Sequence, residues 1–143
     1  MSKNFTTKLI FFLTIVMFFS CKGEQNKIPN VYVNITLDLN KPDYSALSGI
    51  GNYVYITGGV SGIVVYRDGL NEFVAFERAC PHDPECGRVY VNDDNSRLVD
   101  KDCCQSEFTI SANGAPVSGP AKNYLKKYQT FYNQNTNTLL ITN

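Results

Sequence analysis

Short runs in which apolar and polar residues alternate recur from residue 31 to the end, and this pattern constrains the fold most. In 31–39 every second residue is Val, Ile or Leu. A period of two places these apolar side chains on one face of a β-strand. One helical turn is favoured at 42–47, after Asn40 as a candidate cap, and no heptad repeat or long amphipathic helix follows. The predicted strands are 31–39, 53–57, 63–67, 72–78, 88–91, 97–99, 107–110, 124–132 and 138–142.

The spacing of these runs predicts an all-β fold, a small antiparallel sandwich or barrel. Asp68 and Gly69 lie between two of the runs and predict a hairpin, because glycine readily adopts a positive φ. The 143 residues suffice for one domain of this kind. Equal numbers of basic and acidic side chains, 13 of each, give a formal net charge of zero. This balance argues against nucleic acid as a partner.

The first 20 residues resemble the signal peptide of a bacterial lipoprotein. Lys3 and Lys8 form a short positively charged stretch before an apolar run at 9–19, and this run is too short to cross a membrane. The resemblance implies that Cys21 carries lipid and that residues 21–30 form a linker. The membrane would then be a partner, and the location would be the bacterial cell envelope, at the periplasmic or surface face of the outer membrane. The alternative is an ordinary signal peptide that leaves Cys21 as a free thiol.

Two loops between predicted strands contain the residues with the most distinctive chemistry. The first, 80–86, holds two cysteines and His82, and the second, 102–108, holds two adjacent cysteines. Because the whole chain has one histidine, a site that needs two imidazoles from one chain is excluded. If Cys21 carries lipid, the other four cysteines form an even set, which favours disulfides in an oxidising compartment. These four are Cys80, Cys86, Cys103 and Cys104.

The residues alone leave three interpretations of these loops. The first is purely structural, with the four cysteines paired as two disulfides. The second is a metal site, because three thiolates and the imidazole of His82 would suit zinc or an iron–sulfur cluster. Side chains of adjacent cysteines diverge in an extended backbone, so at most three of these four groups would converge. The third is a redox or catalytic thiol at Cys80. No second base accompanies it, so we assign no catalytic residue.

From about residue 31 to the end, the chain resembles a Rieske-type iron–sulfur domain. In this all-β family two hairpin loops hold a 2Fe-2S cluster. The first loop of the family runs Cys-x-His and matches residues 80–82, whereas the second runs Cys-Pro-x-His-Gly-Ser-x-Phe and matches at Ser106 and Phe108. A later Gly-Pro-Ala stretch matches residues 119–121. The resemblance implies a Rieske-like domain over 31–143, with a small subdomain formed around the two loops, in a family of electron carriers.

The second loop departs from the family at its ligand positions. Lys101 takes the place of the second ligand cysteine, and Cys104 takes the place of the second ligand histidine. A lysine ammonium does not bind iron, and a standard Rieske centre uses two histidines on one iron. We therefore expect no cofactor. The resemblance further implies a disulfide between Cys86 and Cys103, and it brings Cys80 close to Cys104 as a second pair in the place of the cluster.

These inferences favour a membrane-anchored, non-catalytic Rieske-type lipoprotein whose loops are held by disulfides and which lacks a standard cluster. The alternative is an electron-transfer protein in which Cys80, His82 and Cys104 bind an atypical, cysteine-rich 2Fe-2S cluster. Replacing an imidazole by a thiolate would lower the potential of such a cluster. A redox or envelope protein would be a further partner in either case.

Overall fold

The computed structural model describes residues 28–143. The predicted signal peptide at 1–20, the predicted lipid site at Cys21 and the linker as far as residue 27 lie outside the described residues. Within the described part, no helix has the length and apolar character needed to cross a membrane.

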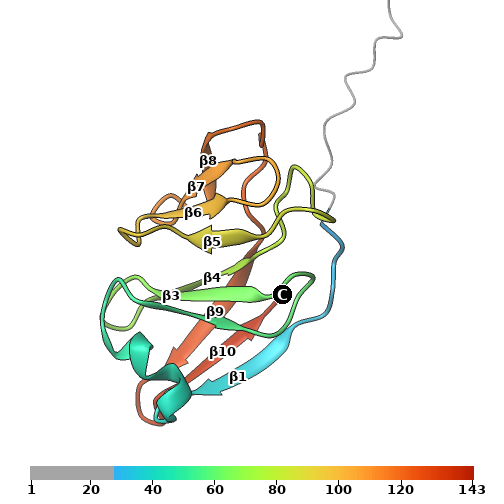
Figure 1. Ribbon diagram of the computed structural model, residues 1–143. Helices are drawn as coiled ribbons and strands as arrows, with labels where there is room; N and C mark the ends of the chain where they lie inside the picture. Colours follow the sequence, from blue (N-terminus) through green and yellow to red (C-terminus); the bar gives the residue numbers. More distant parts are fainter. Residues whose placement is uncertain (1–27) are drawn as a thin grey trace, which may run out of the picture.

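Antiparallel strands form two sheets, which confirms the all-β prediction (Figure 1). The larger sheet has six strands in the order β1-β10-β9-β4-β3-β2, and the smaller has four in the order β5-β6-β7-β8. A short 3₁₀ helix, η2, follows the first strand. The elements are β1 (Asn34–Asp38), η2 (Pro42–Ser48), β2 (Tyr53–Ile56), β3 (Ile63–Arg67), β4 (Phe73–Glu77), β5 (Val89–Val91), β6 (Arg97–Asp100), β7 (Glu107–Thr109), β8 (Ala115–Ser118), β9 (Lys127–Asn133) and β10 (Thr138–Thr142).

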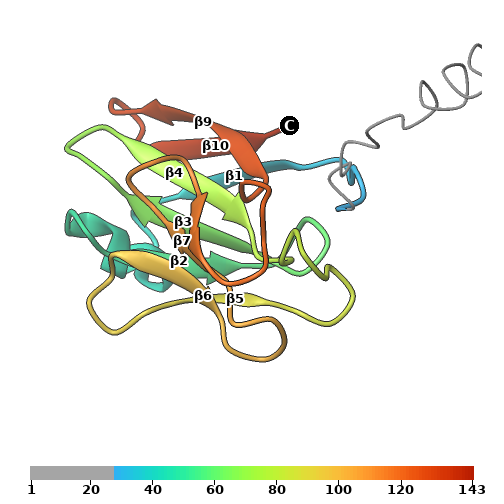
Figure 2. The ribbon, with the colours of Figure 1, turned by 90° about the horizontal axis from the view of Figure 1, so that it is seen from above.

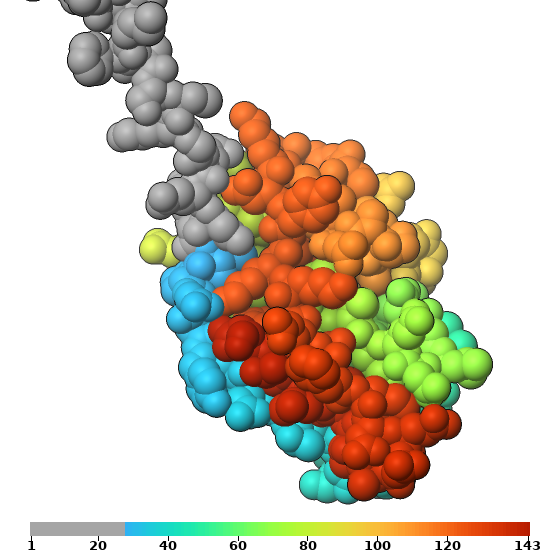
Figure 3. Space-filling model, turned by 180° about the vertical axis from the view of Figure 1, so that it is seen from behind, coloured from blue at the N-terminus to red at the C-terminus, as the bar shows by residue number. Residues whose placement is uncertain are grey.

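The two ends of the described chain meet in the larger sheet. β1 pairs with β10, so that Leu37 lies opposite Leu139, and β9 joins this pair to β4. The space-filling view shows the N-terminal segment in blue beside the C-terminal strands in red (Figure 3). The alternating apolar residues of these strands point into one core. Its buried members are Val33, Leu37, Leu47, Ile63, Val65, Phe73, Ala75, Tyr128, Leu139 and Ile141.

A second core lies between the small sheet and the β3–β4 part of the large sheet. Val64 and Phe76 from the large sheet pack there with Phe108 from the small one, and all three are almost completely buried. Seen from above, the small sheet overlies this part of the large sheet (Figure 2). Ile63 and Val65 face the first core, because neighbouring residues of a strand point to opposite sides. Burial on both faces explains why β3 begins with three consecutive apolar residues.

The structure differs from the sequence-based prediction in several elements. β8 was not predicted, because its four residues show no clear alternation, and Pro116 is tolerated there because β8 is an edge strand. β1 is shorter than the predicted run 31–39, and β9 begins at Lys127 rather than at residue 124. The predicted cap at Asn40 is wrong: η2 begins after Lys41, and no side chain caps it.

The carboxylate of Glu77 fastens the turn between β2 and β3 to the end of β4. Its side chain is 0% exposed. The two oxygens accept hydrogen bonds of 2.7–3.1 Å from the amides of Val60, Ser61 and Ala79 and from the hydroxyl of Tyr128. Burial raises the pKa of Tyr128, and so does its hydrogen bond to Glu77, so the hydroxyl keeps its proton and remains a donor. Four donors thus compensate one buried negative charge.

Replacing Glu77 with Gln should lower the free energy of unfolding by about 2–4 kcal/mol, because the side-chain amide turns two hydrogens toward groups that are themselves donors. Urea unfolding at neutral pH measures the change. Glu72→Gln is the matched control: this carboxylate is exposed and lies just before the same strand, so the change there should stay below about 0.5 kcal/mol. Equal changes in the two variants would contradict a structural role for Glu77.

Candidate functional site

The two cysteine-bearing loops meet beside the small sheet and are joined covalently. The first loop leads from β4 to β5, and the second connects β6 to β7. Cys86 and Cys103 form a disulfide, with their Cα atoms 6.1 Å apart. This confirms the pairing that the Rieske resemblance implies. The bond ties the two loops together at their surface side, since Cys86 is exposed and Cys103 is half-buried.

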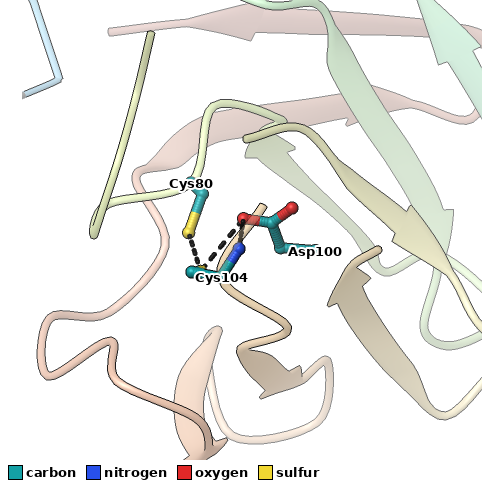
Figure 4. Close-up of side chains that lie close together, drawn as sticks. All are labelled: Cys80, Asp100 and Cys104. Carbon is teal, nitrogen blue, oxygen red and sulfur yellow. Dashed lines mark hydrogen bonds between the residues drawn. The ribbon is translucent and has the colours of Figure 1, made fainter. Parts of the chain in front are cut away.

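Cys80 and Cys104 lie at the inner side of the same junction (Figure 4). Their Sγ atoms are 3.2 Å apart, and both residues are free thiols in the structure. The second disulfide predicted between them is therefore not formed here, although the two side chains are brought together. Cys80 is completely buried in the second core, and Cys104 is half-buried against it. Cys104 is consequently the sulfur that a reagent from solvent reaches first.

Asp100, at the end of β6, holds the second loop around Cys104. Its side chain is 0% exposed. One oxygen accepts hydrogen bonds from the amides of Asp102 and Cys103, and the other lies 3.0 Å from Cys104 Sγ and 3.4 Å from its amide nitrogen. Burial alone would raise the pKa of Asp100, but the hydrogen bonds from Cys104 and Cys103 outweigh it and hold the pKa below its usual range. Asp100 therefore stays ionised beside the thiol pair.

Gly87 allows the two loops to approach this closely. A Cβ atom at this position would lie 2.2 Å from a carboxylate oxygen of Asp100 and 2.9 Å from the Cβ of Cys80. Any other residue would push Asp100 away from the thiols or move the first loop. The absence of a side chain at Gly87 is thus a steric requirement of the thiol pair.

The stretch that matches the Gly-Pro-Ala segment of the family is tied to the same site through Ser106. The Ser106 hydroxyl accepts a hydrogen bond of 3.0 Å from the amide of Ala121 and lies 3.1 Å from Cys104 Sγ. A Cβ atom at Gly119 would come within 2.6 Å of the Cα of Ser106. The loop after β8 therefore packs directly against the residue that contacts Cys104.

His82 does not join this cluster. It is exposed, and it lines a surface cavity of about 400 Å³ together with Asp83 and Glu85. Within residues 28–143, the ligating atoms of Cys80, Asp100 and Cys104 lie within 4.8 Å of one another, and His82 is not among them. The predicted ligand set is thus brought together only at its two cysteines. The chain turns outward after the buried Pro81, which directs the imidazole to solvent.

Sequence reasoning missed Asp100 and Gly87. In the sequence, Asp100 is typical of a polar residue that ends a short strand, and nothing in the sequence shows that its carboxylate is buried. Gly87 reads as an ordinary loop glycine. The only available signal is that both residues adjoin the cysteine-bearing loops.

Burial raises the pKa of Cys80 to about 12, and the neighbouring thiol of Cys104 contributes in the same direction. Cys80 is therefore a neutral thiol at neutral pH. An unfolded chain would ionise the same thiol near pH 8.5. Above that pH the unfolded state binds fewer protons than the folded state, so stability must fall as pH rises.

The dithiol form should accordingly lose stability from about pH 8.5 upward, by about 2 kcal/mol at pH 10. Urea unfolding under argon, with the Cys86–Cys103 disulfide intact, measures this slope. Because Tyr128 contributes with the same sign at higher pH, the Cys80→Ala variant is the control, and it should show a shallower decline. A decline identical to that of the wild type would show that Cys80 is not the group responsible.

Comparisons of this chain with models of known protein families and with curated proteins found no match.

Proposed function

We propose that this protein is a membrane-anchored, non-catalytic Rieske-type module in which a cysteine pair takes the place of the iron–sulfur cluster. The observation that carries the proposal is the 3.2 Å distance between Cys80 Sγ and Cys104 Sγ. These are the two positions that the resemblance assigns to cluster ligands. A thiol pair at this distance closes to a disulfide after small side-chain movements.

Closure of the pair is an oxidation with a defined balance. The two thiols of Cys80 and Cys104 lose two protons and two electrons, and one S–S bond forms. The electrons pass to the disulfide of an exchange partner, which is reduced to two thiols. Because Cys104 is half-buried and Cys80 is completely buried, Cys104 forms the mixed disulfide and Cys80 resolves it. In the closed form, two disulfides would hold the loops where iron holds them in the family.

Protein purified without reducing agent should contain no free thiol at Cys80 or Cys104, no acid-labile sulfide, and no absorption band between about 400 and 600 nm. Thiol titration in denaturant, mass spectrometry and metal analysis measure these quantities. Cys104→Ala should then lower the free energy of unfolding of the oxidised protein by about 2–3 kcal/mol, since the bridge would close a further short ring across the loops that the Cys86–Cys103 disulfide already joins. A coloured protein with about two irons per chain would overturn the proposal.

A second candidate function is binding of a single metal ion, and the cluster of Cys80, Asp100 and Cys104 favours it. Two thiolates and one carboxylate suit Zn²⁺, which takes four ligands and would need one more from solvent or a partner. The fit to a 2Fe-2S cluster is poorer, because that group needs four protein ligands and Lys101 stands where one would be. Stoichiometric zinc that protects both thiols from alkylation would favour this candidate over the disulfide.

The membrane anchor is tested separately at Cys21. Cys21→Ala should move the protein from the membrane fraction to the soluble fraction, because the thioether-linked lipid has no other attachment point in the proposed scheme. Fractionation of cells that express the full chain, followed by immunoblotting, measures the shift. Cys21→Ser is a second variant that keeps the size of the side chain. Retention of both variants in the detergent-soluble membrane fraction would remove the lipoprotein assignment.

A further inference from the structure

A groove away from the thiol pair is lined by the turn between β2 and β3, residues 57–62, and by the side chain of Arg78. The groove has a volume of about 470 Å³, and Arg88 lies on its wall as well as Arg78. We call it the arginine groove. Three glycines of the turn, at positions 58, 59 and 62, have positive φ, which lets the backbone bend around this space. Cavities of about 300–1,000 Å³ are typical of small-molecule sites.

Arg78 is held in a fixed orientation in this groove. Its guanidinium carbon lies 3.9 Å from the ring centroid of Tyr55 and 4.8 Å from that of Tyr90, and its Nε donates a 3.0 Å hydrogen bond to the carbonyl of Val89. The residue is only 7% exposed. The two rings cover the faces of the guanidinium. The hydrogen bond to the backbone uses one of its N–H donors. A side-chain hydrogen bond with Tyr90 uses one further donor, which leaves three of the five N–H groups of the guanidinium for a ligand.

The positive charge of this groove has no carboxylate to balance it. In the described part of the chain, the one ion pair joins Arg97 to Glu107, so neither Arg78 nor Arg88 has an acidic partner within salt-bridge distance. Burial lowers the pKa of Arg78, and the charge of Arg88 lowers it further. Glu77 lies beneath the same turn, but its oxygens already accept four hydrogen bonds. Two neighbouring guanidinium groups, one of them buried, therefore favour an anion from outside.

Two hydroxyl groups add neutral donors to the same space. Thr57 and Ser61 line the groove, and neither hydroxyl makes a hydrogen bond to another part of residues 28–143. We propose that the arginine groove binds a phosphoryl group through Arg78 and Arg88, with Thr57 and Ser61 as further donors. A phosphate monoester carries about −1.5 to −2 charges at neutral pH and three acceptor oxygens, which matches two cations and two hydroxyls better than a carboxylate does.

The phosphoryl group has two sources with the same chemistry, a free phosphorylated metabolite or a lipid headgroup. Calorimetric titration of the full chain with inorganic phosphate, phenyl phosphate and dihexanoyl phosphatidic acid below its micellar concentration separates them. Binding of all three indicates a free ligand, and binding of the short-chain lipid alone indicates a headgroup. Either result supports the groove as a phosphoryl site. Absence of binding by all three would overturn the proposal.

Substitutions of arginines inside and outside the groove test whether the phosphoryl group binds there. Arg88→Gln should weaken the affinity by about 10- to 100-fold, the loss expected for one charge-assisted hydrogen bond or more. The matched control is Arg97→Gln, which removes the same charge from an exposed arginine outside the groove and should leave the affinity unchanged. Arg78→Lys keeps the charge but loses the planar fork, and it should also weaken binding if thermal unfolding shows that it is folded. Equal weakening by Arg88→Gln and Arg97→Gln would show nonspecific attraction and overturn the assignment.

Discussion

The ionised carboxylate of Asp100 is the constraint on which the cysteine-bearing junction depends. It is completely buried, and it has no cationic partner among residues 28–143. Its charge is compensated by the amides of the loop that follows, so the loop must wrap around it. This wrapping turns Cys104 inward to meet Cys80. Without the carboxylate, the amides of Asp102 and Cys103 would lose their acceptor, and the Cys86–Cys103 disulfide would join the two loops without fixing Cys104 in its inward position.

Glu77, which lies just before the first loop, is likewise a buried carboxylate compensated by backbone amides. It is a buried carboxylate that accepts bonds from backbone amides and a tyrosine hydroxyl rather than from a basic side chain. Hydrogen bonds from amides fix the direction of a loop more precisely than an ion pair with a flexible side chain does. Each of the two carboxylates therefore holds a turn in place through backbone amides. They also leave Arg78 and Arg88 without counter-charges.

The disulfide and the thiol pair lie on opposite sides of the junction between the two loops. The Cys86–Cys103 bond closes the surface side of the two loops, and the pair of Cys80 and Cys104 lies at the core side. Because Cys80 belongs to the second core, a chemical change at its sulfur alters the packing of the side chains between the two sheets. The position of His82 on the outside of the first loop separates the imidazole from the sulfur chemistry. The junction is thus organised by two cysteine pairs and one carboxylate.

Sequence alone determined the all-β class, most strand positions and the two loops that meet at the site, because strand alternation and turn residues are local signals. It also implied, through the Rieske resemblance, that Cys86 pairs with Cys103. Tertiary structure decided that Asp100 rather than His82 lies beside Cys80 and Cys104, that Gly87 leaves the space for this approach, and that Arg78 is stacked between two tyrosines. The physical reason is that the burial of a charged or bulky side chain depends on groups supplied by distant segments. Local alternation shows which face of a strand is apolar, but it does not show which donors, rings or carboxylates will meet there.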